Sequence, residues 1–324
     1  MMKVAIIVPY FGTLPNYFQL FLNSCRYNGK FDWIIFTDDC TEYDYPENVH
    51  KIKMNFSECK NLIQGKFPFD ISLNSPQKLC DFKPAYGYIF DDYLLTYDWW
   101  GHCDLDQIFG DLSQFVTEER LEKYEKIYSL GHLTLYKNIE KINKLFMKDL
   151  NGISRYKDVF TNPLGEAFDE WLPGNINEIF IDQHINALYE NDGADINSYY
   201  TQFRTVDYDV KLRKYINSEI KNSIFLWDKG RLFQIYVQNR LIKKKEFPYV
   251  HLQKRKMKDC RINKNVDKFY IIPNKFIDEG KDAINLLNKC MLYRIFNYQF
   301  FKVKYASLKL RIKNNNWKRQ NVFD

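Results

Sequence analysis

The sequence predicts an α/β protein in which helices flank a mixed, mainly parallel sheet. Residues 3–9, 33–37 and 49–54 are short apolar runs of the kind that form buried parallel strands. The intervening segments 16–27 and 56–63 carry apolar residues at helical spacing, and strands that alternate with helices indicate a parallel sheet. The 324 residues are 45% hydrophobic and 27% charged, which excludes a disordered or collagen-like chain.

The C-terminal segment, residues 281–324, is basic and amphipathic. Ten lysines and arginines against two aspartates give it a net charge of +8, which leaves −2 for residues 1–280. Apolar residues recur between the basic ones at spacings of three and four, which predicts a helix. Such a helix could lie on an anionic membrane surface or pack its apolar stripe on the rest of the protein, and both interpretations stay open. Nucleic acid is not expected as a partner, because no recognised binding motif accompanies the charge.

The apolar segments are too short to cross a bilayer, since no run approaches about 18 consecutive apolar residues. We interpret the N-terminal run as a first strand and not as a signal peptide. The seven cysteines include no C-x-x-C pair, which is typical of a chain with reduced thiols. We therefore expect a cytoplasmic protein, peripheral on the inner face of the plasma membrane if the C-terminal segment binds lipid.

Polar and aromatic residues follow the first two predicted strands. Pro9, Tyr10 and Phe11 end the first strand, and Asp38 and Asp39 end the second. Because ligands of parallel sheets bind beyond the C-terminal strand ends, we expect these residues to contact a ligand. Neither a G-x-G-x-x-G nor a G-x-x-x-x-G-K-S/T motif occurs, so the sequence supports neither a Rossmann dinucleotide loop nor a P-loop.

The richest chemistry lies in residues 75–112, where an apolar strand ends at Asp104-Leu105-Asp106. In an extended segment, side chains two residues apart point to the same face. Two carboxylates placed in this way can share Mn²⁺ or Mg²⁺, directly or through water, and the ion can then neutralise a diphosphate leaving group. A second D-x-D triplet, Asp207-Tyr208-Asp209, is interpreted as solvated surface.

The order of strand-Pro-Tyr-Phe, strand-Thr-Asp-Asp, helix with Asp81, apolar strand and D-x-D resembles a GT-A glycosyltransferase. The stretch from Asp81 to Asp106 is similar to the DXD-containing sugar transferases of bacterial polysaccharide (capsule or lipopolysaccharide) biosynthesis. The resemblance implies a nucleoside-diphosphate sugar donor, with a UDP-sugar as the first expectation, and a saccharide or lipid-linked acceptor. It also implies that Asp81, with Lys83 nearby, contacts the nucleotide sugar.

Residues 181–186 look like the Asp-Gln-Asp-x-x-Asn segment of retaining transferases related to glycogenin, although a histidine replaces the second aspartate. By that resemblance, Asp182 and Gln183 reach the donor sugar, and the anomeric configuration is retained. The same stretch also has the apolar spacing of an amphipathic helix with a buried stripe, and the two interpretations are compatible.

Two further segments hold candidate site residues. In several GT-A families a late histidine completes the metal site and a diphosphate-binding lysine follows it, which suggests these roles for His251 and Lys254; a solvated basic loop is the alternative. Asp169 and Glu170, beside aromatic residues, suit an acceptor-sugar site in which a ring stacks and a carboxylate accepts a hydroxyl proton. They fit equally well at the edge of a turn before Pro173.

These observations predict a metal-dependent glycosyltransferase domain over residues 1–260, with a nucleotide-binding half at 1–112 and an acceptor half at 113–260. A basic, amphipathic helical region follows at 261–324. A metal-dependent phosphoesterase or nuclease, and a non-enzymatic membrane-surface adaptor, are the alternatives. A hydrolase of that kind usually needs more acidic ligands than this segment offers, and an adaptor leaves the D-x-D strand unexplained.

Overall fold

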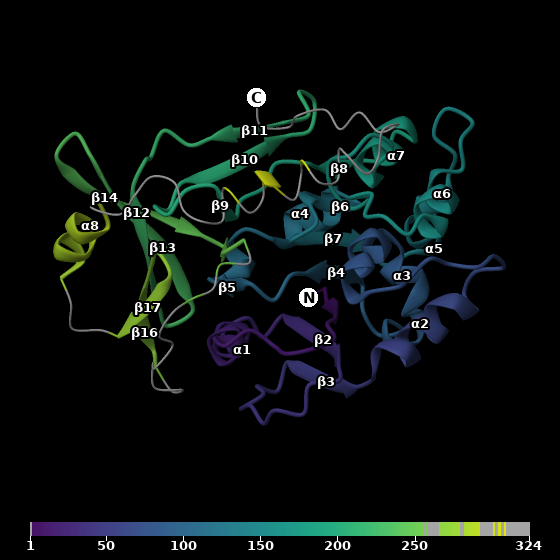
Figure 1. The fold of residues 1–324 in the computed structure, drawn as a ribbon, viewed down its shortest axis with the longest axis horizontal. Helices are drawn as coiled ribbons and strands as arrows, with labels where there is room; N and C mark the ends of the chain where they lie inside the picture. The colour runs from purple at the N-terminus through teal and green to yellow at the C-terminus, as the bar shows by residue number, and fades with distance from the viewer. Residues whose placement is uncertain are drawn as a thin grey trace. The chain divides into compact units, whose positions relative to one another are not determined.

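The computed structural model describes residues 2–253, 255, 257, 266–278, 282–291, 301, 304, 305 and 308. The chain forms two compact units (Figure 1). Unit 1 comprises Met1–Phe18, Asn28–Leu105 and Ser113–Asn191; unit 2 comprises Gln19–Tyr27, Asp106–Leu112 and Asp192–Asp324. The chain therefore passes from unit 1 to unit 2 within the Asp104-Leu105-Asp106 triplet.

Unit 1 contains a seven-stranded sheet in the order β3-β2-β1-β4-β7-β6-β8. The strands β3, β2, β1 and β4 run parallel, β7 is antiparallel to β4 and β6, and β8 is parallel to β6. Their bounds are β1 Val4–Pro9, β2 Phe31–Thr37, β3 Val49–Lys53, β4 Trp99–Cys103, β6 Lys126–Leu130, β7 Leu133–Lys137 and β8 Ala187–Leu188. The predicted α/β class with a mixed, mainly parallel sheet is confirmed, and the first three strands lie where their apolar runs predict them.

The helices of unit 1 cover the sheet and fill the connections. They are α2 Phe56–Gly65, α3 Tyr86–Ile89, α4 Glu118–Lys123, α5 Glu140–Asn143, α6 Arg155–Thr161 and α7 Ile176–Asp182, with 3₁₀ segments η1 Pro76–Ala85, η2 Asp91–Tyr93 and η4 Leu145–Met147. A further 3₁₀ turn, η3 Leu112–Gln114, begins at the last residue of a unit 2 segment. The helix expected around Asp81 is instead the 3₁₀ segment η1, which continues into α3.

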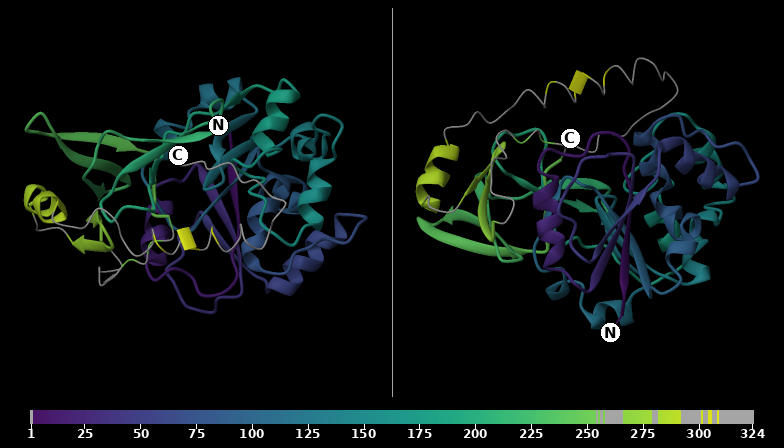
Figure 2. Two further views of the ribbon diagram at one scale, coloured as in Figure 1. Left: turned by 45° about the horizontal axis from the view of Figure 1, so that its top comes forward. Right: turned by 90° about the horizontal axis from the view of Figure 1, so that it is seen from below.

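One apolar core joins the sheet of unit 1 to its helices. Ala5 and Ile34 of the sheet pack in the same buried cluster as Ile63 of α2 and Ile89 of α3, and both helices lie on the same side of the strands in Figure 2 (right). The Asn55 side chain accepts a hydrogen bond from the Glu58 backbone N–H at 3.0 Å, and the Glu58 carboxylate accepts one from the Asn55 N–H at 2.7 Å. This capping box fixes the start of α2.

Unit 2 is built mainly from antiparallel strands, which the sequence analysis does not anticipate. One sheet has the order β11-β10-β9-β15-β5 and the other β14-β13-β12-β16-β17. The bounds are β5 Gln107–Phe109, β9 Ala194–Ile196, β10 Thr205–Asp209, β11 Lys214–Asn217, β12 Ser223–Asp228, β13 Arg231–Gln238, β14 Leu241–Phe247, β15 Tyr249–His251, β16 Lys268–Ile272 and β17 Lys275–Asp278. Asp207 of the second D-x-D triplet is exposed in β10, in agreement with its interpretation as surface.

The prediction of a wholly helical region over 261–324 is wrong for its first described part, which is a β-hairpin of β16 and β17. The physical reason is the alternation of half-buried Lys268 and Tyr270 with buried Phe269 and Ile271, followed by a turn at Asn274, whose φ is +64°. Helix α8 (Ala283–Met291), which is labelled in Figure 1, then packs Leu286 and Leu287 against β12. In α8, therefore, the apolar stripe covers the protein body. Most of the segment beyond it lies outside the described residues, and its membrane role stays a prediction.

Helix α1 (Phe18–Arg26) lies in unit 2 apart from its first residue. Among the described residues, no helix has the length and apolar character that crossing a membrane requires.

Lys126 in the sheet of unit 1 is a buried lysine that has no carboxylate partner among the described residues. Lys126 of β6 donates from Nζ to the Tyr128 carbonyl at 2.5 Å and to Asn177 Oδ1 at 2.6 Å. Rings of Tyr136, Phe180 and Tyr189 surround the ammonium, with centroids 5.5–5.8 Å away. Burial lowers the pKa of Lys126 to about 7.

This lysine makes stability depend on pH. Between pH 7 and about 10, an unfolded Lys126 keeps its proton while the folded one loses it, so the free energy of unfolding rises with pH in this window. The slope approaches about 1.4 kcal/mol per pH unit. Chemical denaturation from pH 6 to 10 should show this rise in the wild type and a flatter curve in Lys126→Met. Parallel curves for the two proteins would mean that Lys126 stays charged when folded.

Candidate functional site

The ammonium of Lys83 organises a buried cluster in unit 1. Its Nζ lies 2.7 Å from Asp104 Oδ1, donates to the Gly131 carbonyl at 2.8 Å, and lies 3.5 Å from Asp169 Oδ2. Burial opposes the charge of Lys83, but Asp104, together with Cys80 and Asp169, holds the pKa of this lysine well above its usual value. Lys83 is therefore a permanent cation that fixes the first carboxylate of the D-x-D triplet.

Asp169 and Glu170 approach the same backbone at Gly131. The Gly131 N–H donates to Glu170 Oε1 at 3.1 Å, and a β-carbon added at Gly131 would lie 2.0 Å from Asp169 Oδ2. Burial raises the pKa of Asp169 well above its usual value, although Lys83 works against this rise. The structure thus brings two predicted catalytic residues, Asp169 and Glu170, together with Asp104 and Lys83.

His102 of β4 contacts the same Gly131 carbonyl as Lys83 does. Its Nδ1 lies 3.0 Å from the Gly131 carbonyl, which also accepts from Lys83. Burial, with the nearby charge of Lys83, lowers the pKa of His102 well below its usual value. A neutral imidazole with its proton on Nδ1 suits this contact, because the carbonyl can only accept.

The Asp81 carboxylate has its partners within the protein, which are a lysine and two backbone N–H groups. Its Oδ2 lies 2.7 Å from Lys78 Nζ, and its carboxylate accepts from the backbone N–H groups of Glu166 and Phe168 at 3.0–3.3 Å. Both charged side chains are at most 3% exposed. The structure therefore gives Asp81 a role in tying η1 to the segment before α7, and its predicted contact with a nucleotide sugar stays a prediction.

The residues at the strand ends of unit 1 shape one loop. Asp38 Oδ1 accepts from the Gly12 N–H at 2.8 Å, and Asp39 accepts from the N–H groups of Leu14 and Thr41 at 3.1 and 2.7 Å. Hydrogen bonds from Thr41 lower the pKa of Asp39 despite its partial burial. The two aspartates thus hold the loop that follows β1.

Within that loop, the Tyr10 N–H donates to the Phe36 carbonyl at 2.8 Å and its hydroxyl to the Thr13 carbonyl at 3.2 Å. Pro9 is half-buried and Phe11 buried. Phe11 belongs to the apolar core of unit 1.

Asp182 and Gln183 lie at the C-terminal end of α7. Asp182 is exposed, and the Gln183 side-chain amide donates to Asp182 Oδ2 at 2.8 Å. In the described part of unit 1, Asp182 forms no ion pair with Lys83. Their predicted role at the donor sugar stays a prediction, as does that of Lys254, which lies outside the described residues.

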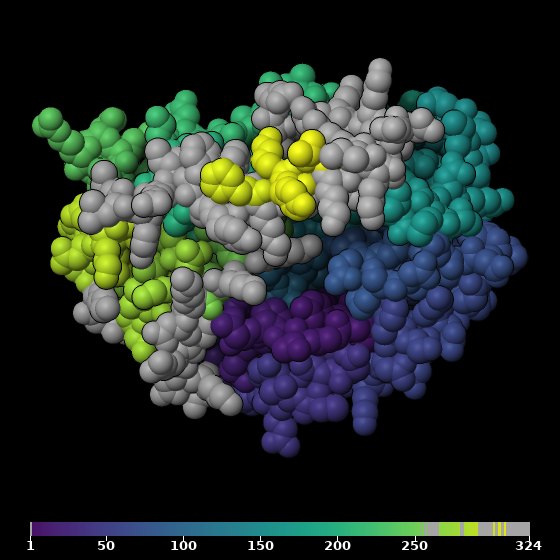
Figure 3. Space-filling model, viewed as in Figure 1, coloured from purple at the N-terminus to yellow at the C-terminus, as the bar shows by residue number. Residues whose placement is uncertain are grey.

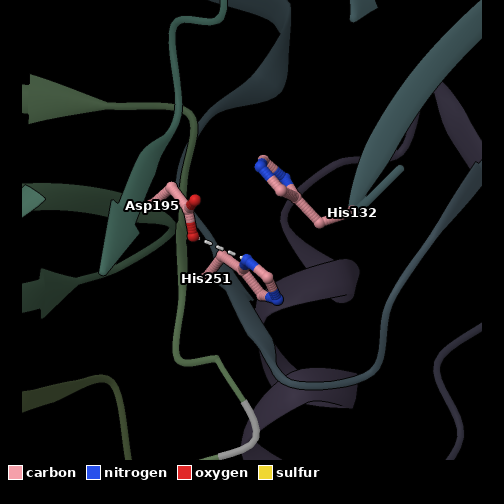
Figure 4. Close-up of side chains that lie close together, drawn as sticks. All are labelled: His132, Asp195 and His251. Carbon is pink, nitrogen blue, oxygen red and sulfur yellow. Dashed lines mark hydrogen bonds and ion pairs between the residues drawn. The ribbon is translucent and has the colours of Figure 1, made fainter. Parts of the chain in front are cut away.

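In unit 2, His251 lies between two carboxylates. Its Nδ1 is 2.8 Å from Asp195 Oδ1, and its Nε2 is 3.2 Å from Asp106 Oδ1; Figure 4 shows the first of these contacts. All three residues are buried. Burial opposes protonation, but Asp106 and Asp195 together hold the pKa of His251 well above its usual value.

Strand pairing explains this geometry. In the sheet of unit 2, His251 of β15 pairs with Asp195 of β9 on one side and with Gln107 of β5 on the other. Paired residues place their side chains on the same face of a sheet. The Leu252 N–H also donates to the Asp106 carbonyl at 2.8 Å, which fixes the residue before β5.

Aspartate and histidine are residue types that bind divalent cations, and unit 2 brings Asp106 and His251 together. Adjacent ligands of an octahedral Mg²⁺ lie about 3 Å apart, because each bond is about 2.1 Å long. The 3.2 Å between Asp106 Oδ1 and His251 Nε2 matches that separation. A hydrogen bond from His251 Nδ1 to a carboxylate is the usual support of a ligating histidine, and Asp195 provides it.

Sequence reasoning missed Asp195, Gly131 and His102. An acidic residue between two apolar ones, as in Ala194-Asp195-Ile196, is the one local signal that could have marked Asp195. Gly131 and His102 act through contacts with residues far along the chain, and no local pattern marks them.

A model of a family of unknown function, DUF6625, matches residues 6–280. The chain belongs to this family. A search of curated proteins found no match.

Several solved structures resemble this DUF6625 member weakly. They include the galactosyltransferase LgtC in complex with donor and acceptor sugar analogues (12% identity, TM-score 0.31) and an active-site mutant of LgtC (12%, TM-score 0.34), each over 60% of this chain and 75% of the other. The apo-form glycosyltransferase GlyE of Streptococcus pneumoniae TIGR4 matches at 14% identity and TM-score 0.28, over 58% of this chain and 45% of its own.

The close contacts at Gly131 predict that a larger residue there lowers the stability of the protein. Gly131→Ala should lower the free energy of unfolding by about 1–3 kcal/mol, since the new methyl group would overlap the Asp169 carboxylate. Gly29→Ala is the matched control, because no atom lies within 4 Å of its added β-carbon. Equal unfolding midpoints in urea for the two variants would show that the Lys83 cluster tolerates expansion.

Proposed function

We propose that this protein is a metal-dependent glycosyltransferase that moves a sugar from a nucleoside-diphosphate donor, a UDP-sugar for preference, to a saccharide or lipid-linked acceptor. Bacterial surface polysaccharide synthesis is the proposed setting, and retention of configuration the proposed outcome. The observation that carries the proposal is the contact between Asp106 and the buried His251. Asp106 is the second aspartate of the D-x-D triplet, and the first one, Asp104, forms an ion pair with Lys83.

Asp104, Asp106 and His251 are the proposed ligands of Mn²⁺ or Mg²⁺. The Asp106–His251 separation supports two of them, and the two-residue spacing of the D-x-D triplet supports Asp104. When bound, such an ion neutralises a diphosphate and makes it a better leaving group. The proposal gives Lys254 a phosphate contact, on the basis of its position after His251.

The proposal gives the residues around Lys83 two roles, which are to orient Asp104 and to contact sugar hydroxyl groups. Lys83 orients Asp104 and places a positive charge next to Asp169. A buried carboxyl whose pKa is raised can hold a proton near neutrality. We assign to Asp169 and Glu170 the contacts with sugar hydroxyl groups, because they lie in this cluster.

The first test is Asp106→Asn, which is nearly isosteric. It should abolish transfer, since it removes one anionic metal ligand, and a thermal melt checks that the variant stays folded after losing the charge that faces His251. Asp207→Asn, in the exposed D-x-D triplet of β10, is the control and should keep full activity. The assay is a screen of nucleotide sugars with Mn²⁺ that measures transfer and hydrolysis separately.

Binding adds an independent measurement. UDP with Mn²⁺ at about a hundred times the dissociation constant should stabilise the wild type by about 2.7 kcal/mol and should not stabilise Asp106→Asn. Wild-type turnover in Asp106→Asn at saturating Mn²⁺ would remove this residue from the site. Hydrolysis of phosphoesters without transfer would favour the hydrolase alternative.

Changes at His251 and at Asp195, which orients its ring, should weaken Mn²⁺ binding to different degrees. His251→Ala should raise the Mn²⁺ concentration needed for half-maximal activity, and Asp195→Asn should weaken Mn²⁺ affinity by about 10–100-fold, because the ring loses its fixed orientation. Titration of Mn²⁺ by electron paramagnetic resonance measures both without turnover. Lys254→Ala should instead raise the KM for the donor and leave the Mn²⁺ titration unchanged. An unchanged Mn²⁺ titration in His251→Ala would refute this ligand while leaving Asp104 and Asp106 in place.

A further inference from the structure

The hairpin of β13 and β14 in unit 2 ends in an exposed tip that carries both basic and apolar side chains. Every residue from Val237 to Lys245 is exposed. Three large aliphatic side chains lie there, Val237, Leu241 and Ile242, at 49–59% exposure. The same nine residues contain four cations and no acidic residue: Arg240, Lys243, Lys244 and Lys245. We call residues 237–245 the hairpin tip.

The geometry of the tip projects these side chains away from the core of unit 2. Val237 pairs with Ile242 and Gln238 with Leu241, so a two-residue turn of Asn239 and Arg240 joins the strands. Figures 1 and 3 show this turn, in green, extending past α8 at the upper left edge. The buried part of β13 ends at Ile235, which packs in the apolar cluster with α8. The tip therefore has no described layer over it.

The turn holds a cation where a glycine would be easier to accommodate. Asn239 and Arg240 have φ values of +52° and +62°, the pattern of a type I′ turn that favours Asn-Gly. An arginine in this conformation is strained. The side chain at the very end of the hairpin is thus a positive charge beside two exposed aliphatic residues.

The charges of the tip are not neutralised within the described part of the protein. Arg231 and Glu246, at the base of the hairpin, pair with each other at 2.6–2.8 Å. No carboxylate of the described residues forms an ion pair with Arg240, Lys243, Lys244 or Lys245. Lys244 and Lys245 lie over the rings of Phe233 and Phe247, at 3.5 and 4.6 Å from the centroids, and these neutral rings leave the net charge of the tip unchanged.

Protection of an edge strand explains only half of this pattern. β14 is at the edge of its sheet, and lysines on edge strands prevent pairing with another chain. That explanation covers Lys243–Lys245 but not the exposed aliphatic side chains at the turn. A second copy of the chain is also disfavoured as the partner, because it would bring another lysine run against this one. Nucleic acid would match the charge but not the aliphatic residues.

We propose that the hairpin tip docks on an anionic lipid surface, with Leu241, Ile242 and Val237 entering the headgroup region and the four cations contacting lipid phosphates. Apolar side chains flanked by lysine and arginine are the combination that such an interface binds. This inference is independent of the proposed catalytic function. It also places membrane contact on a described hairpin and not on the C-terminal segment.

The test uses the full-length protein with vesicles of phosphatidylcholine alone or with phosphatidylglycerol. Leu241→Ser/Ile242→Ser should lower partitioning to the anionic vesicles at least ten-fold, and Lys243→Gln/Lys244→Gln by roughly five-fold per lysine, with the lysine effect lost at high salt. Leu95→Ser and Lys30→Gln remove an exposed leucine and an exposed lysine of unit 1 and should bind as the wild type does. Thermal melts check that each variant is folded.

A reporter at the tip separates this surface from the C-terminal segment. Leu241→Trp should show added fluorescence, relative to the wild type, that shifts to the blue and is quenched by brominated phosphatidylglycerol. Three vesicle results would overturn the proposal. The tip variants could bind like the wild type, the full-length protein could fail to bind anionic vesicles, or the added fluorescence of Leu241→Trp could stay unquenched while the protein is bound.

Two results with other partners would also overturn it. One is lysine-dependent binding to a random DNA duplex that is stronger than vesicle binding and unaffected by Leu241→Ser/Ile242→Ser. The other is dimerisation through β14.

Discussion

The ion pairs of Lys83 are the interaction on which unit 1 of this protein depends. One ammonium joins η1 to the end of β4 through Asp104, to the β6–β7 turn through the Gly131 carbonyl, and to the segment before α7 through Asp169. Burying a charge is costly unless it is paired and hydrogen-bonded, and here the ammonium donates to Asp104 and to the Gly131 carbonyl and lies near the Asp169 carboxylate. The loss of Lys83 would leave buried carboxylates without their cation, so fold and site chemistry share this residue.

Unit 2 presents the complementary case, in which strand register and not an ion pair sets the geometry. The parallel pairing of His251 with Asp195, and the antiparallel pairing of the same strand with β5, determine which side chains can meet. The histidine then has one ring nitrogen toward Asp195 and the other toward Asp106. In this arrangement His251 can bind a metal ion through Nε2 while Asp195 orients the ring through Nδ1. The metal proposal therefore rests more on this unit than on the D-x-D spacing.

The elements that the sequence predicts well are those with a strong local pattern. The apolar runs that become β1, β2 and β3 form the parallel edge of the sheet, where burial tolerates continuous apolar sequence, and the capping box of α2 is local. The antiparallel sheets of unit 2 are harder to predict, because β14 is exposed along most of its length and its lysines resemble a solvated loop. The β16–β17 hairpin has a visible alternation at Phe269 and Ile271, but the strongly basic residues that follow it suggest one continuous helical region.

The same distinction applies to the site residues. Asp104, Asp106 and His251 are predictable as candidates because chemistry restricts which residue types can bind a cation, and a D-x-D triplet after an apolar strand is a local signal. Asp195 lies 56 positions before His251 in the sequence and becomes its neighbour only through the pairing of β9 with β15. Asp81 and Lys83 show the limit of this reasoning: two residues apart on one 3₁₀ segment, they form ion pairs with different partners, Lys78 and Asp104. Their chemical types suit a ligand site equally well, and only the folded structure shows which partner each of them has.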